Sequence, residues 1–363
     1  MNNGQMEFEI SSSQKAMTNN LANAIKALRD GKVILLLDAH DRENEGDLVV
    51  AAERITEETM NFLIKKGSGV VCLALPKARL DELGLPLMIS DNTNFFQTAF
   101  TVSIEAKLGV TTGVSAKDRA HTIQTAMKDF AHRDDLARPG HVFPLAARKN
   151  GIFDRMGHTE GAVDLMRMAG LKPGAVLCEL MNEDGSMTVG EKRVEFAQRF
   201  GIPIVTIEEV LFYRTQTEVI ANKSEVTRNT RFGNLSWKSF SFFDHIVVDV
   251  FHKNEEPKEK GVRIALSLGG DILKRFLANV LEQTEDDALV NGLSQVEQGK
   301  SDYAVMCTSK YGPHLKSQAE LTALMHAAIC RVLQELKVKE VNGCSIGHEI
   351  GRIASNYFSI ALI

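Results

Sequence analysis

The chain is poor in cysteine and aromatic residues and has no excess of positive charge. It has 363 residues, of which five are cysteine and one is tryptophan, and aromatic residues make up 6%. Five cysteines without a Cys-x-x-Cys pair fit neither a disulfide framework nor a cysteine-built zinc site. The formal net charge is −5, whereas a nucleic-acid-binding module needs a basic groove with stacking aromatic side chains. We therefore expect no nucleic-acid partner.

Long apolar runs are also missing. No segment approaches the roughly eighteen uninterrupted apolar residues that span a membrane. Residues 1–15 lack the basic segment and following apolar segment of a secretion signal. We expect a cytoplasmic protein without a membrane partner, and the 44% hydrophobic content is enough for a sizeable core.

Strand-like and helix-like segments alternate over the first part of the chain. Residues 33–38 are apolar without alternation, which is typical of a strand covered on both faces. A helix precedes this strand, with Leu21, Ile25 and Leu28 on one face and Gly31 near its end. The alternation predicts an α/β (α+β) domain, a three-layer sandwich with a mixed twisted sheet. The later predicted elements are helix 57–67, strand 70–76, helix 77–84, strand 99–106, helix 116–127, strand 142–148, helix 159–170, strand 175–181, helix 191–201 and strand 202–207.

A polar stretch suggests a domain boundary. We predict a first domain over 1–215, a linker over 216–234 and a smaller C-terminal α/β domain over 235–363. The C-terminal domain has predicted strands at 242–251 and 263–268, a charged turn at 254–261, and helices at 273–283 and 321–337.

The stretch DRENEGD, residues 41–47, follows the first apolar strand and is crowded with carboxylates. Glu43, Glu45 and Asp47 recur at every second residue, so an extended backbone would direct all three to one face. A divalent cation such as Mg²⁺ or Mn²⁺ would relieve their repulsion. Arg42 could neutralise its neighbours or orient an anionic or hydroxyl-rich substrate. Taken alone, the stretch is explained more simply as a solvated acidic turn.

A second stretch could supply groups to the same site. Residues 153–166 place Gly157, His158 and Thr159 at the mouth of a helix, where free N–H groups and Arg155 could hold a phosphate. A helix cap is the alternative explanation for these residues.

Three further positions are candidates. Pro139 and Gly140 predict a turn that places His141 at the start of a strand. Thr112 lies in a glycine- and hydroxyl-rich turn before a helix and could bind phosphate, although an ordinary loop explains it equally well. Glu179 is an acid in an apolar strand, a costly placement unless it is paired, metal-bound or used as an acid or base.

Together these motifs resemble the 3,4-dihydroxy-2-butanone 4-phosphate synthase family. The resemblance runs in order from about Leu21 to Arg214 through DRENEGD, KGSGVVCL, DNTNFF with TAFTVSIEA, GVTTGVSAKDR, RPGHVFPL, RMGHTEGAVDLM and AVLCEL. It implies conversion of D-ribulose 5-phosphate into L-3,4-dihydroxy-2-butanone 4-phosphate and formate in riboflavin biosynthesis. It also implies Mg²⁺ (or Mn²⁺), with two ions per site, and a homodimer whose sites lie near the subunit interface.

The resemblance also implies residue roles. Glu43 and His158 are expected as metal ligands. The expected catalytic residues are His141, Glu179, Asp47 and Glu45. The expected substrate-binding residues are Arg42, Glu43, Asp47, Thr112, Arg155, Gly157, His158, Thr159 and Glu179.

The C-terminal domain occupies the place of a GTP cyclohydrolase II domain in fused members of this family. Cys307, Cys330 and Cys344 are too scattered for that enzyme's zinc site, and GHEIGRI only partly resembles its arginine-rich motif. We expect a cyclohydrolase-like domain without cyclohydrolase activity, the alternative being an unrelated α/β domain. For the first domain the alternatives are another Mg²⁺-dependent phosphosugar isomerase or aldolase, and a non-enzymatic nucleotide- or RNA-binding module.

Overall fold

The computed structural model describes most of the chain and divides into two compact units. The described residues are 12–40, 42–218, 221–230, 233–242, 246–253, 262–268, 293–296, 298, 301–309, 318–342, 348–358 and 360–362. The N-terminal unit comprises mainly residues 18–210 and the C-terminal unit mainly residues 211–362.

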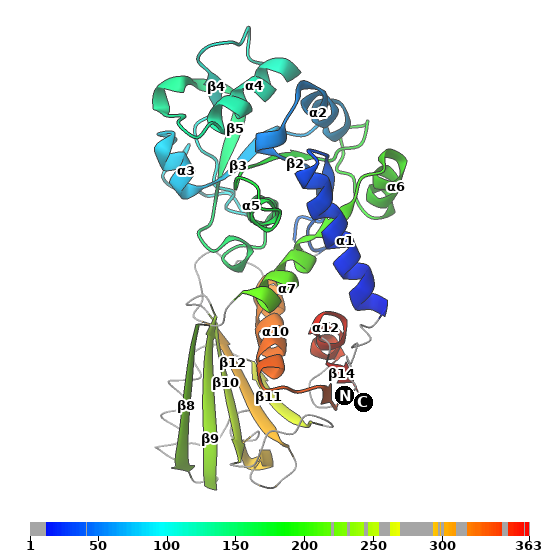
Figure 1. Cartoon of the computed structure of the whole chain (residues 1–363), viewed down its shortest axis with the longest axis vertical. Coiled ribbons are helices and arrows are strands. Elements are labelled where there is room, and N and C mark those ends of the chain that lie inside the picture. Colours follow the sequence, from blue (N-terminus) through cyan, green and yellow to red (C-terminus); the bar gives the residue numbers. More distant parts are fainter. Residues whose placement is uncertain are drawn as a thin grey trace, which may run out of the picture. The chain divides into compact units, whose positions relative to one another are not determined.

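A mixed seven-stranded sheet organises the N-terminal unit, and Figure 1 labels four of its strands, β2, β3, β4 and β5. The strand order is β4-β5-β3-β6-β2-β1-β7. The pairs β1/β7 and β3/β5 are parallel and the other neighbours are antiparallel. The strands are β1 (Ile34–Leu37), β2 (Gly46–Ala51), β3 (Cys72–Pro76), β4 (Ile104–Ala106), β5 (Leu136–Ala147), β6 (Ala175–Glu179) and β7 (Ile204–Thr206). The predicted mixed sheet is confirmed.

Helices cover both faces of this sheet and complete the three predicted layers. Helix α5 packs on β3, β5 and β6, whereas α2 and α4 pack together and α4 also contacts β4 and β5. The helices are α1 (Ser12–Arg29), α2 (Glu57–Phe62) with a π-helical turn (Leu63–Gly67), α3 (Lys77–Glu82), α4 (Ala116–Ala126), α5 (His158–Met168), α6 (Glu191–Phe200) and α7 (Ile207–Thr217).

Local sequence signals explain two helix ends. The chain leaves α1 through Gly31, whose φ of +71° is a left-handed conformation that glycine adopts at little cost. Helix α4 begins after Ser115, whose side chain accepts a hydrogen bond from the Asp118 N–H at 3.0 Å.

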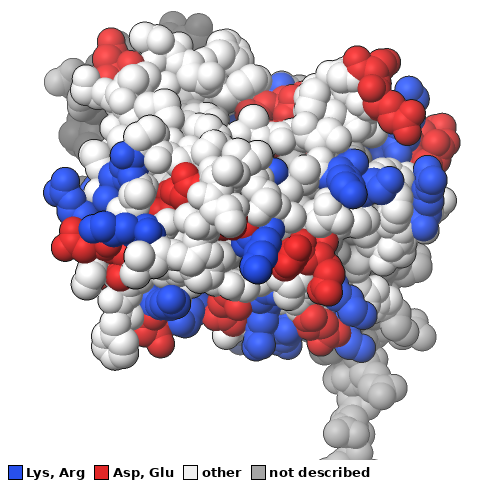
Figure 2. Space-filling model, turned by 90° about the horizontal axis from the view of Figure 1, so that it is seen from above, with Lys and Arg blue, Asp and Glu red and all other residues white. Residues whose placement is uncertain are grey.

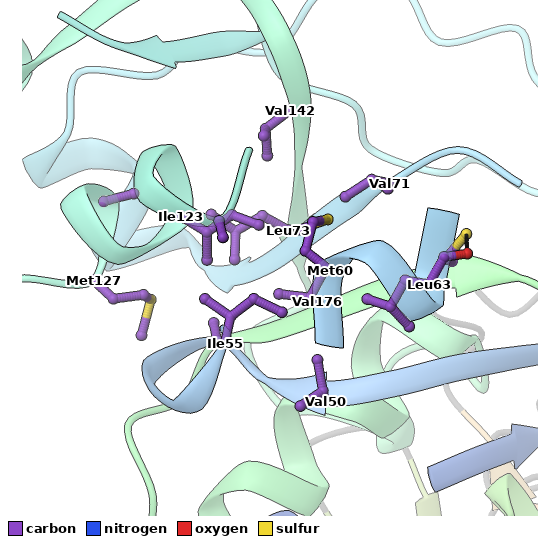
Figure 3. Packing of buried hydrophobic residues seen from close by; sticks show 14 of the residues in the cluster. Val50, Ile55, Met60, Leu63, Val71, Leu73, Ile123, Met127, Val142 and Val176 are labelled. Carbon is purple, nitrogen blue, oxygen red and sulfur yellow. Dashed lines mark hydrogen bonds between the residues drawn. The ribbon is translucent and has the colours of Figure 1, made fainter. Parts of the chain in front are cut away.

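The main apolar core lies between the sheet and helices α2 and α4. Val50, Leu73 and Val176 point from the sheet toward Met60 and Ile123 (Figure 3). All five side chains are fully buried, and burial of one side chain of this kind contributes about 1.5–3 kcal/mol. The opposite face of the same strands is therefore left free to carry polar groups next to α5.

The structure corrects two predictions about loops. The acidic stretch is not an extended segment: it turns between β1 and the unpredicted strand β2, and Asn44 at its tip has a φ of +57°. The predicted turn at Pro139 and Gly140 is also wrong, because both lie inside β5. There the β4–β5 register shifts, and a Cβ on Gly140 would lie 2.1 Å from the backbone of Ile104, so the strand bulges where only glycine fits.

The C-terminal unit contains a five-stranded sheet of order β11-β12-β10-β9-β8. Its strands are β8 (Ala221–Thr230), β9 (Gly233–Phe242), β10 (Ile246–Lys253), β11 (Ile264–Leu268) and β12 (Tyr303–Ser309). Helix α10 (Gln318–Glu335) packs on β10 and β12 and also contacts α12 (His348–Phe358). A small parallel pair joins β13 (Glu340–Val341) to β14 (Ala361–Leu362).

The structure corrects the predicted linker over residues 216–234. Residues 221–230 form β8, which pairs with β9, because a polar segment can still satisfy its backbone at the edge of a sheet. The predicted strands at 242–251 and 263–268 and the helix at 321–337 correspond to β10, β11 and α10. The predicted turn at 254–261 and helix at 273–283 lie outside the described residues.

Surface charge and helix hydropathy agree with the composition. On the face shown in Figure 2, acidic and basic side chains are interspersed and neither sign forms a continuous area. Within the part of the chain that the structure describes, no helix is both long and apolar enough to cross a membrane.

Candidate active site

The acidic turn and the start of α5 meet at one point on the α5 side of the sheet. Antiparallel pairing of β2 with β6 puts Asp47 directly opposite Glu179, so their side chains emerge on the same face. His158 is the first residue of α5, and its ring nitrogens lie 3.4 Å from Glu43 Oε2 and 3.9 Å from Asp47 Oδ1. The fold therefore gathers four residues from three segments that are far apart in the sequence.

Asp38 and Arg42 hold the acidic turn in shape. Asp38 accepts hydrogen bonds from the backbone N–H groups of Glu43 at 3.1 Å and Glu45 at 2.9 Å. Arg42 donates to Asp38 at 3.1 Å and to Glu43 at 2.5 Å, and its guanidinium lies over the Phe96 ring. Because Arg42 is nearly enclosed, its charge balances these buried acids rather than a solvent ion.

Arg193 on α6 holds the other side of the turn. Its guanidinium donates to the Glu45 carbonyl at 3.0 Å and to the Asn44 side chain at 3.2 Å. This contact fixes the tip where Asn44 adopts its left-handed conformation. Nothing in the α6 sequence distinguished Arg193 from other helix-surface arginines, so sequence reasoning missed it.

A pocket of about 220 Å³ opens at this cluster. Glu43, Glu45, Asp47, His158 and Glu179 contribute to its wall. The other lining residues are Cys72, Asn94, Phe96, Thr98, Phe100, Leu145, Arg155, Thr159 and Leu177. Of these, Asn94, Phe96 and Thr98 come from a loop whose role the sequence did not reveal.

Arg155 links that loop to the start of α5. Its three guanidinium nitrogens donate to the Phe96 carbonyl at 3.0 Å, to Thr98 at 3.2 Å and to Glu160 at 2.7 Å. Gly157 lies so close that a Cβ there would meet Arg155 Nη1 at 2.1 Å, so a side chain at that position would displace the arginine. Arg155 therefore contacts the protein at every guanidinium nitrogen, and two of its five N–H groups remain for a ligand.

The cluster perturbs the protonation of its own members. Burial alone would raise the pKa of Glu43, but the hydrogen bond to His158 and the charge of Arg42 outweigh it and hold that pKa at about 2. Burial raises the pKa of Asp47 to about 7, and the carboxylate of Glu179 adds to the effect against the opposing charge of His158. Burial would lower the pKa of His158, but Asp47 and the bond to Glu43 raise it to about 9.

The donor set fits a divalent cation. Ligand atoms of Asp38, Glu43 and His158 lie within 4.8 Å of one another. Asp47 Oδ1 and His158 Nε2 are buried without a hydrogen-bond partner and face each other across 3.9 Å. Carboxylate oxygens with one imidazole suit Mg²⁺ or Mn²⁺, which bind through few protein ligands and keep water or substrate oxygens.

Two predicted site residues lie apart from this pocket. His141, half exposed on β5, places Nδ1 3.3 Å from Glu105 Oε2. Glu105 also lies against Gly113, next to Thr112, because a Cβ on Gly113 would nearly coincide with its carboxylate. His141 and Thr112 therefore belong to a second cluster around Glu105, and neither lines the acidic pocket.

Comparisons with known proteins agree with this geometry. The family model for 3,4-dihydroxy-2-butanone 4-phosphate synthase matches residues 22–213. Relatives of that name from Shewanella halifaxensis and Vibrio cholerae are 57% and 55% identical to this chain, covering 53% and 54% of it and 91% and 90% of the relatives. The chain belongs to the 3,4-dihydroxy-2-butanone 4-phosphate synthase family.

Solved structures extend the family assignment. The crystal structure of RibBX, a two-domain 3,4-dihydroxy-2-butanone 4-phosphate synthase from A. baumannii, is 31% identical with a TM-score of 0.71, over 89% of this chain and 92% of that one. A synthase of this family solved in complex with two magnesium ions is 38% identical with a TM-score of 0.52, over 54% of this chain and 97% of that one. One of these similar structures thus has two domains, and the other contains two magnesium ions.

The contact between Arg155 and Glu160 gives a stability prediction. Glu160 is 1% exposed, and burial raises its pKa although Arg155 lies against it. Arg155→Met would leave this acid buried without its cation, so we expect the free energy of unfolding to fall by about 3–5 kcal/mol in urea titrations. Adding Glu160→Gln should recover part of the loss, and equal losses in the single and double variants would contradict the pairing.

The contact between Arg193 and the acidic turn gives a metal-affinity prediction. Arg193→Gln should raise the Mg²⁺ concentration needed for half-maximal activity on the order of tenfold, because a group that orients metal ligands is lost. Maximal activity at saturating Mg²⁺ should change less, and Arg193→Lys should restore part of the affinity. Gln198→Ala, at an exposed position of the same helix, is the control. An unchanged Mg²⁺ requirement in Arg193→Gln would show that the contact does not order the turn.

Proposed function

We propose that this chain converts D-ribulose 5-phosphate into L-3,4-dihydroxy-2-butanone 4-phosphate and formate, as a carbon–carbon lyase of riboflavin biosynthesis. The observation that carries the proposal is the convergence of Glu43, Asp47, His158 and Glu179 on one pocket in a chain of the synthase family. The pocket is small and polar enough to surround the oxygens of a pentulose phosphate.

Glu43 and His158 are the proposed metal ligands, with Asp38 as a further oxygen donor beside them. When bound, Mg²⁺, as one or two ions, would stabilise the negative charge that develops on the substrate's vicinal oxygens. Mn²⁺ has similar ligand preferences and is expected to substitute. The low pKa of Glu43 keeps this ligand ionised at neutral pH.

Asp47 and Glu179 are the proposed proton-transfer groups. The reaction requires removal of a proton next to the ketone, loss of water and a shift of the carbon skeleton, and each step needs an acid or base in contact with the sugar. A pKa of about 7 lets Asp47 both accept and donate a proton near neutral pH. Glu179 accepts a hydrogen bond from the Val70 N–H at 2.7 Å, which holds its carboxylate in place. Glu45 lines the same pocket and is a further candidate for proton transfer.

The phosphate is assigned to the start of α5. His158 and Thr159 begin the helix after Gly157, where N–H groups without helical partners and the helix dipole favour an anion. The N–H groups of Arg155 that the protein does not use would add positive charge there. Met156 is buried, so its side chain leaves this surface open.

A homodimer would explain the second cluster. We assign His141 and Thr112 to the active site of the opposite subunit, where they would contact the phosphate or protonate an oxygen. Apolar side chains exposed on this unit, among them Leu87, Ile89 and Val114, favour burial in such an interface. The buried free thiols are consistent with a reducing, cytoplasmic location.

The C-terminal domain is proposed to be cyclohydrolase-like without the zinc-dependent activity. Cys307 and Cys330 are fully buried and burial raises the pKa of both thiols, so neither is a ready zinc thiolate. Cys344 lies outside the described residues. The domain is then expected to stabilise the protein or to regulate the synthase.

The reaction itself is the first test of this proposal. Purified protein with ribulose 5-phosphate and MgCl₂ should form formate and the four-carbon phosphate in equal amounts by NMR, and EDTA should abolish both. Asp47→Asn should slow turnover about 10²- to 10⁴-fold, whereas Glu57→Gln, at an exposed position of α2, should not. A changed sugar without formate would indicate an isomerase or aldolase instead.

Hybrid dimers test the shared site. Glu43→Gln and His141→Ala should each be inactive alone. Refolding the two variants together at equal concentration should recover about a quarter of wild-type activity, because heterodimers then contain one site with both residues intact. Failure to recover activity in mixtures shown to contain heterodimers would place both residues in the same subunit's site.

The second unit is tested with GTP. The full chain with ZnCl₂ should release no formate from GTP above the rate without protein. Zinc-dependent formate release would contradict a silent domain.

A further inference from the structure

A second groove of about 440 Å³ lies on the N-terminal unit and shares no lining residue with the acidic pocket. It is formed by α6, the π-helical turn after α2, and the segment that follows β6. Its lining residues are Lys65, Lys66, Ser68, Met181, Asn182, Glu183, Thr188, Lys192, Glu195, Phe196, Arg199 and Phe200.

The groove carries cations that the protein does not neutralise. Within the described ranges Lys65, Lys66 and Arg199 form no salt bridge, although Glu183 and Glu195 lie on the same rim. Lys66 Nζ and Arg199 Cζ lie over the Phe200 ring at 5.7 and 5.4 Å from its centroid. An exposed cation–π contact contributes about 0.5–1 kcal/mol, which is less than a charge-assisted hydrogen bond to phosphate contributes. Both side chains can therefore leave the ring and bind an anion.

The floor of the groove is apolar. Phe196 and Phe200 pack together with ring centroids 4.7 Å apart, and Met181 lies beside them in the lining. A bare inorganic anion would use only the cations, whereas an anion with an organic part would also cover these rings. The two features together fit a small organic phosphate.

Two segments connect this groove to the acidic pocket. Ser68, in the groove wall, has a φ of +69° and begins the turn in which the Val70 N–H binds Glu179 at 2.7 Å. Helix α6 supplies both groove residues and Arg193, which holds the acidic turn. A ligand that orders either segment therefore acts on a group of the acidic pocket.

We propose that this groove is a second ligand site, which binds a small organic phosphate and thereby strengthens the hold of Arg193 on the acidic turn. The site is separate from the proposed substrate pocket. Its coupling to metal affinity rests on the proposed function, whereas its binding does not.

Binding is tested on the metal-free full chain by calorimetry with adenosine 5′-monophosphate (AMP) as probe. We expect one AMP per chain to bind, and inorganic phosphate to bind more weakly because it does not cover the Phe196 and Phe200 rings. Lys66→Glu with Arg199→Glu should weaken AMP binding at least on the order of tenfold. Lys26→Glu, an exposed charge reversal on α1, and Glu43→Gln should leave it unchanged. Thermal melts would establish that each variant is folded.

Three outcomes would overturn the binding site, and a fourth would overturn its coupling to the acidic turn. The site is refuted if AMP does not bind at millimolar concentration, or if the groove variant retains full affinity. Loss of AMP binding in the Glu43→Gln variant would indicate that AMP binds in the acidic pocket instead. In activity titrations over controlled free Mg²⁺ concentrations, bound AMP should lower the Mg²⁺ requirement of the wild type but not that of the groove variant. An unchanged requirement in the wild type would refute the coupling while leaving the binding result intact.

Discussion

The electrostatic balance around His158 is the constraint on which the site depends. Asp38, Glu43 and Asp47 are brought together at a partly closed pocket, where like charges repel strongly. One imidazole and the guanidinium of Arg42 oppose them in the protein itself. The remaining excess of negative charge is what a divalent cation would neutralise. The crowding that destabilises the fold locally is therefore also what suits this cluster to a metal ion.

The sheet makes this crowding possible. Pairing of β2 with β6 fixes Asp47 opposite Glu179, and α5 packs on the same sheet so that His158 lies close to Asp47. The apolar core on the other face stabilises these strands without involving the polar groups. Arg155 then fixes the loop around Phe96, and Arg193 fixes the acidic turn.

Sequence reasoning predicted most elements and singled out the acidic stretch as a candidate site, but it did not predict the connections between them. Apolar runs and capping residues such as Ser115 are local signals, so strands and helix starts were readable. Strand β2 was missed because its first residues belong to the acidic motif, and the bulge at Gly140 depends on the approach of Ile104 from another strand. Arg193 acquires its role only through a contact with a distant segment, which no local signal predicts. The separation of His141 from the pocket likewise follows from the three-dimensional structure and not from the sequence.

The central claim is that the acidic turn and His158 form the metal centre. Crystals of the protein soaked with MnCl₂ and measured at the manganese absorption edge would locate the ion directly. The account predicts anomalous density bonded to the Glu43 carboxylate and a His158 ring nitrogen, and its absence from a Glu43→Gln crystal. Manganese bound elsewhere, or bound equally in that variant, would contradict it.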